Sequence, residues 1–174
     1  EITEVKFSDI AWKDDSSGFY YNKYPKPLPE NRLSQQSYDA AIYFADIRTG
    51  EEKLFYGQIN PEQNYTVSFI GEDKKILIKV ITGSEEENFY LFGKSLETLE
   101  PITPINQASF NYVHADDEGL FFITNLEADN YRLVKVLFAD LQMVEIVSED
   151  NFALKGVSFV NDYLIADYID HADM

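Results

Sequence analysis

The chain has 174 residues and a formal net charge of −17, from 14 Lys and Arg against 31 Asp and Glu. This charge disfavours nucleic acids, which are bound through cations that neutralise phosphates, and membrane surfaces, whose anionic headgroups would repel the protein. No apolar run approaches the roughly 20 residues of a membrane-spanning helix, and 45% hydrophobic residues are too many for a disordered chain. We therefore expect a folded protein that binds neither nucleic acid nor membrane.

Short runs rich in Phe, Tyr, Ile and Val recur along the chain, whereas the spacing of an amphipathic helix is hard to find. In chain order these runs predict strands at residues 5–13, 18–23, 40–47, 53–58, 65–70, 75–81, 88–92, 110–114, 120–124, 131–138, 143–148, 157–160 and 163–168. Many short strands at even spacing are typical of a sandwich, a barrel or a propeller.

An internal repeat favours the propeller. An acidic turn precedes the apolar runs that begin at Phe19, Ile76 and Leu120, and a weaker copy precedes Tyr163. The intervals from Ile76 to Leu120 and from Leu120 to Tyr163 match the roughly 40 to 50 residues of a four-stranded propeller blade. The interval from Phe19 to Ile76 is longer because of a proline-containing polar stretch at 24–37. In the acidic turns at 14–15 and 116–118 we expect Asp to accept backbone hydrogen bonds and glycine to supply a positive φ.

The sequence thus predicts an all-β propeller segment of about three and a half four-stranded antiparallel blades, an open arc rather than a closed ring. The expected blades are 5–58, 65–107, 109–150 and a partial one at 153–171. Because a propeller normally needs at least about four blades, we expect a piece of a larger protein. The absence of an initiator Met before Glu1 agrees with that expectation.

Two stretches resemble the prolyl oligopeptidase family. Residues 5–12 (VKFSDIAW), Asp15 and residues 18–27 (GFYYNKYPKP) are similar to one of its early propeller blades, and residues 124–125 (TN) with 130–133 (NYRL) give a less specific match. The resemblance implies a parent serine peptidase in which a propeller caps an α/β-hydrolase domain that cleaves short peptides after proline. This chain would be the middle part of the propeller, which admits peptides and excludes folded proteins.

The resemblance also implies two substrate-lining residues. Phe7 matches an aromatic residue that faces the substrate, and Ser84 falls where some members carry a cysteine close to the active site. An arginine found just before that cysteine in some members has no counterpart here, where Ile81 and Thr82 stand.

Catalytic chemistry is missing from the sequence itself. No Gly-x-Ser-x-Gly nucleophile elbow is present, so we expect no catalytic triad and no activity from the segment alone. We interpret His114 and His171 as solvated loop histidines. With no cysteine, and with Asp167, Asp170, His171 and Asp173 at an end where nothing fixes their geometry, we expect no metal site and no cofactor.

Two alternatives remain open. One is the propeller of an oligopeptidase B-type peptidase, and the other is a stand-alone β-propeller or β-sandwich that acts as a protein-interaction scaffold. The expected partners are a peptide substrate and a hydrolase domain within the parent enzyme. We also expect self-association through open blade edges, and a cytoplasmic protein, with the periplasm as the alternative.

Overall fold

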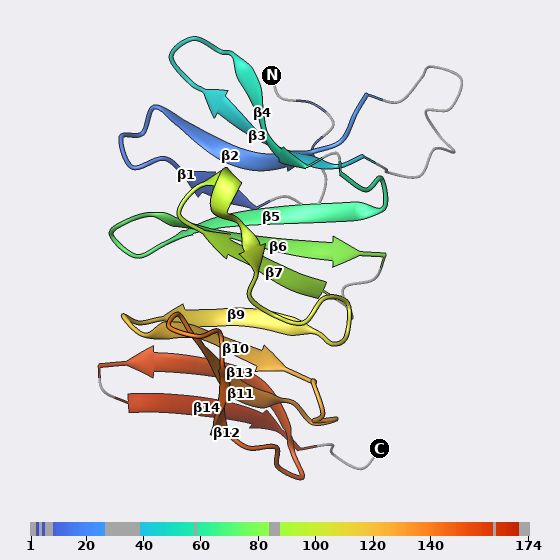
Figure 1. Ribbon diagram of the computed structural model, residues 1–174, viewed down its shortest axis with the longest axis vertical. Helices are drawn as coiled ribbons and strands as arrows, with labels where there is room; N and C mark the ends of the chain where they lie inside the picture. The colour runs from blue at the N-terminus through green and yellow to red at the C-terminus, as the bar shows by residue number, and fades with distance from the viewer. Residues whose placement is uncertain are drawn as a thin grey trace. The chain divides into compact units, whose positions relative to one another are not determined.

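A computed structural model describes residues 3, 5, 9–26, 39–57, 59–83, 88–161 and 163–170. In this part of the chain the regular structure is β-strand apart from one 3-10 turn, η2 (Leu96–Thr98). The strands form four antiparallel sheets (Figure 1), three of four strands and one of two, in each of which every strand pairs with its neighbour along the chain. The predicted all-β fold, built from repeated four-stranded antiparallel units, is confirmed.

The first sheet lies in unit 1, one of two compact units, which comprises Glu1–Glu85 and Leu91–Glu100. Its strands are β1 (Ile10–Trp12), β2 (Gly18–Lys23), β3 (Ala41–Asp46) and β4 (Glu52–Gly57). The second sheet contains β5 (Gln63–Ile70), β6 (Lys75–Thr82), β7 (Asn88–Gly93) and β8 (Glu100–Pro101).

Within unit 1 an aromatic cluster joins the first sheet to β5. The Tyr20 ring lies 5.0 Å from Phe44, 4.7 Å from Phe55 and 4.9 Å from Phe69, measured between ring centroids. Aromatic rings in such tilted and edge-on arrangements contribute about 0.5–1.5 kcal/mol per pair beyond the area they bury. The aromatic residues that predicted the strands therefore also bring the two sheets together.

Unit 2, which comprises Glu86–Tyr90 and Pro101–Met174, contains the third and fourth sheets. The third sheet has the strands β9 (Phe110–Ala115), β10 (Gly119–Thr124), β11 (Arg132–Leu137) and β12 (Met143–Val147). The fourth consists of β13 (Ala153–Val160) and β14 (Tyr163–Ile169).

Burial along the strands of unit 2 explains their sequence patterns. Every residue of β10 is buried, as its continuous apolar run predicts for a strand covered on both faces. The core of this unit contains Phe121, Ile123, Leu133 and Leu154, against which Leu164 of β14 packs. The other face of β14 carries Tyr163 and Ile165, which are 74% and 49% exposed, so β14 alternates between covered and open side chains.

The acidic turns form as expected, with aspartate oxygens accepting backbone hydrogen bonds. Asp15 Oδ1 accepts from the Ser17 amide at 2.9 Å, and Asp116 Oδ1 accepts from the amides of Glu118 and Gly119, both at 2.9 Å. These bonds stabilise the sharp turn between two strands from within the turn itself.

The glycines of these turns serve a different purpose from the predicted one. Gly18 and Gly119 do not have a positive φ, and in the first turn that conformation is adopted by Ser16, at 54°. A Cβ at Gly18 would lie 2.2 Å from the Ala45 carbonyl oxygen, and one at Gly119 would lie 2.3 Å from that of Val136. The glycines therefore allow two backbones to approach closely, and the expectation of a positive φ was wrong.

Candidate functional site

The two substrate-lining residues implied by the resemblance, Phe7 and Ser84, lie outside the described residues. His171 lies outside them as well.

An aromatic pocket of about 310 Å³ lies in unit 1, beside the turn between β1 and β2. Its apolar walls are the rings of Trp12, Tyr20 and Phe69, and its rim carries charged residues; the lining is Trp12, Lys13, Asp14, Asp15, Tyr20, Phe69 and Lys74. Trp12 is 56% exposed and contacts Phe19 at 5.2 Å between ring centroids. A concave, mainly apolar space with a few polar groups is the usual form of a ligand site.

Two ion pairs stand at the rim of the pocket. Lys74 Nζ, in the turn between β5 and β6, lies 3.0 Å from Asp14 Oδ1, in the turn between β1 and β2. Lys13 Nζ lies 3.0 Å from Asp15 Oδ2 and donates a hydrogen bond to Ser17 Oγ at 3.2 Å. The hydrogen bonds from Ser17 and Lys13 hold the pKa of Asp15 well below its usual range.

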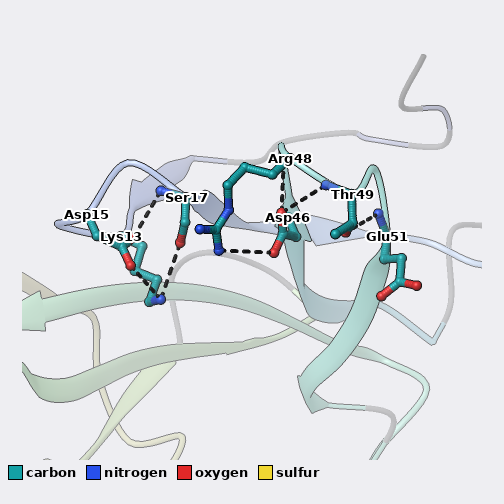
Figure 2. Close-up of polar contacts among 7 residues, drawn as sticks. All are labelled: Lys13, Asp15, Ser17, Asp46, Arg48, Thr49 and Glu51. Atoms are coloured by element: carbon teal, nitrogen blue, oxygen red, sulfur yellow. Dashed lines mark hydrogen bonds and ion pairs between the residues drawn. The ribbon is translucent and has the colours of Figure 1, made fainter.

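Figure 2 shows this turn beside the neighbouring turn of the first sheet, between β3 and β4. There Asp46 Oδ1 accepts hydrogen bonds from the amides of Arg48 and Thr49 at 2.8 and 3.1 Å, which lower the pKa of Asp46. The Glu51 amide donates to Thr49 Oγ1 at 3.3 Å. The lowered pKa values of Asp15 and Asp46 fit carboxylates that stabilise turns, so these two are poor candidates for general acids or bases.

A second polar group connects β2 with β4. Glu52 accepts hydrogen bonds from Lys23 Nζ and the Tyr21 hydroxyl, and these lower its pKa. Burial is the main cause that raises the pKa of Tyr21, and the hydrogen bond to Glu52 raises it further. Lys23 Nζ also lies 5.4 Å from the centroid of the Tyr43 ring. Glu52 thus pairs with both Lys23 and Tyr21, so the cluster stabilises the sheet. It provides no activated nucleophile, because the pKa of Tyr21 is raised.

His114 is not the solvated loop histidine that the sequence suggested. It lies on β9, is partly buried, and stacks on Phe159 with 4.4 Å between centroids and 21° between planes. Phe121 lies 5.9 Å from it. Two aromatic neighbours give His114 a packing role within unit 2.

The described residues contain no group of three or more His, Cys, Asp or Glu side chains placed to hold a metal ion. Among the same residues, no helix has the length and apolar character needed to cross a membrane.

Sequence reasoning missed the pocket because Phe69 and Lys74 are far from Trp12 along the chain. The repeat contained a usable signal, since the turns at 14–15 and 72–75 occupy equivalent positions in successive sequence repeats. Equivalent turns of adjacent repeats are expected to be neighbours. A pairing of Asp14 with Lys74 could have been predicted on that ground.

Consecutive four-stranded antiparallel sheets, each connected in chain order, define a protein of the β-propeller class. The family described as "Prolyl oligopeptidase, N-terminal beta-propeller domain" matches residues 1–173. The chain belongs to this family.

Known proteins similar to this chain include the prolyl endopeptidase of Elizabethkingia meningoseptica, which is 28% identical over 139 residues covering 77% of this chain and 19% of that protein. The prolyl endopeptidase of Dictyostelium discoideum is 24% identical, over 90% of this chain and 25% of that protein. The chain thus spans about a fifth to a quarter of the length of these relatives.

Solved structures show the same fold. Prolyl oligopeptidase B from Galerina marginata, bound to a 35mer hydrolysis and macrocyclization substrate, superposes with a TM-score of 0.78 at 20% identity. The match covers 95% of this chain and 25% of that one.

Proposed function

We propose that this chain is a non-catalytic, substrate-gating part of a serine peptidase that cleaves short peptides after proline. The observation that carries the proposal is the family match over residues 1–173. The relatives named prolyl endopeptidase support specificity for proline over the oligopeptidase B alternative. The peptide substrate and the hydrolase domain are then partners of this segment through the parent enzyme.

The chemistry of the chain agrees with a non-catalytic role. The sequence has no nucleophile elbow. The ring of His114 stacks on Phe159 and lies beside Phe121, which gives it a packing role. Chemistry must then come from another part of the parent protein, and the propeller contributes by controlling which molecules reach it.

Two measurements test this proposal. The 174-residue chain should not hydrolyse a proline-containing chromogenic peptide, and turnover by the purified chain would contradict the non-catalytic role. The parent enzyme should cleave a short proline peptide much faster than an unfolded protein that contains the same cleavage sequence. Comparable rates on both substrates would contradict gating.

We also propose that the 174-residue chain associates with itself through β14. Within the described residues this strand pairs only with β13, so its outer edge is open. Val160, Tyr163 and Ile165 stand on the exposed face of the same sheet, at 50%, 74% and 49% exposure. An unpaired strand edge beside exposed apolar side chains favours edge-to-edge pairing.

A further inference from the structure

The proposed gating role leaves the aromatic pocket of unit 1 unused. Its walls are held in place before any ligand arrives, because the Tyr20 ring contacts Phe44, Phe55 and Phe69 within 5.0 Å between centroids. A preformed wall needs little reorganisation on binding, which lowers the entropic cost of association. Trp12 completes the pocket with a ring that is 56% exposed.

The charges at the rim indicate the polarity of the ligand. In both ion pairs the carboxylate is the more exposed partner: Asp14 is 67% exposed against 49% for Lys74, and Asp15 is 56% exposed against 46% for Lys13. Lys13 is further occupied by Ser17 Oγ. Both oxygens of Asp15 already accept bonds, from the Ser17 amide and from Lys13. A ligand at the mouth of the pocket therefore meets the negatively charged Asp14 more readily than it meets ammonium groups.

The charge of the whole chain acts in the same direction. A net charge of −17 repels anionic ligands and attracts cationic ones. An ammonium group near the indole of Trp12 would gain a further cation–π attraction.

We propose that this pocket binds a small aromatic amine, with its ring between Trp12 and Phe69 and its ammonium group directed to Asp14. The size of the pocket, about 310 Å³, is at the lower end of the range for small-molecule sites. This assignment does not depend on the peptidase proposal, since it rests on residues of unit 1 alone.

Trp12 makes the test direct because it is the sole tryptophan of the chain. The 174-residue chain is titrated with 2-phenylethylamine while tryptophan fluorescence is excited at wavelengths where tyrosine does not absorb. We expect a saturable change with a Kd on the order of 5 mM, as suits so few ligand atoms. Absence of saturation would overturn the proposal.

Two further probes separate the parts of the ligand. We expect 3-phenylpropanoate, which has the ring but a negative charge, and butylamine, which has the charge but no ring, to bind at least about threefold more weakly. Equal binding of the carboxylate would refute the role of the rim charges. Equal binding of butylamine would refute the role of the aromatic walls.

Variants locate the binding. Phe69→Leu removes a wall and should weaken binding of 2-phenylethylamine at least about threefold, whereas Phe152→Leu, at a 43% exposed position in unit 2, should leave it unchanged. Asp14→Asn should weaken binding of the amine about twofold and leave binding of benzyl alcohol, an uncharged ring, unaltered. Wild-type affinity in both pocket variants would overturn the assignment, provided that circular dichroism shows both to be folded.

Discussion

Lys135 Nζ, on a side chain that is 8% exposed, lies 2.8 Å from Asp116 Oδ2 in the turn between β9 and β10. Burial by itself would lower the pKa of Lys135, but its hydrogen bonds to Asp116 and Glu118 raise it. Desolvation likewise opposes the ionisation of Asp116, whose pKa is nevertheless lowered by Lys135 and by two backbone amides. One aspartate thus shapes the turn and neutralises a buried cation.

Removing the Asp116 side chain should destabilise the protein in two separable ways. Asp116→Ala loses the bonds to the Glu118 and Gly119 amides and leaves Glu118 as the carboxylate that pairs with Lys135. We therefore expect a cost of about 2 kcal/mol in the free energy of unfolding. Asp116→Asn keeps an oxygen for the amides and loses only the charge, and should cost about 1 kcal/mol. Urea unfolding measures both. Equal costs would show that the turn bonds contribute nothing.

The same pair of residues predicts a dependence of stability on pH. Because the folded pKa of Asp116 is below its ordinary value of 3.8, its stabilisation is complete above that pH and is lost as the pH falls toward the folded pKa. The difference in unfolding free energy between the wild type and Asp116→Asn should therefore be constant near neutral pH and shrink below about pH 4. A difference that grew in acid would contradict this assignment.

Gly119 should be intolerant of any side chain. In Gly119→Ala the new Cβ would stand 2.3 Å from the Val136 carbonyl oxygen, so the β10–β11 pairing must shift. We expect destabilisation of about 3 kcal/mol in urea or thermal unfolding. Gly156→Ala is the matched control, because its Cβ meets only the Asp167 carboxylate at 3.6 Å, and it should change stability by less than about 0.5 kcal/mol.

Self-association of the 174-residue chain should depend on β14. Ile165→Lys places a charge on the exposed face of an open edge strand and should shift the chain toward the monomer in light scattering. Leu96→Lys, at a 39% exposed position on η2, serves as the control and should leave the association unchanged. A wild-type chain that is already monomeric at high concentration would contradict association through this edge.

The strands were largely predictable because their signals are local. Aromatic and β-branched runs between polar turns mark β2 at the predicted residues 18–23, and the bounds of most other strands differ by one or two residues. The short strand β8 was missed, since two residues that include Pro101 have no strand signal of their own and pair only because β7 lies beside them. The acidic turns were predicted for a similar reason, as an aspartate that bonds the next amides needs no distant partner.

The remaining features required the tertiary structure because they depend on groups far apart in sequence. The reason for glycine at 119 is the Val136 carbonyl across the sheet, and the environment of His114 is set by Phe159 on another sheet. The pocket likewise exists only because packing places Trp12 next to Phe69. The sequence by itself determined the strands, the repeat and the family, whereas close approach between strands and sheets decided the packing and the candidate site.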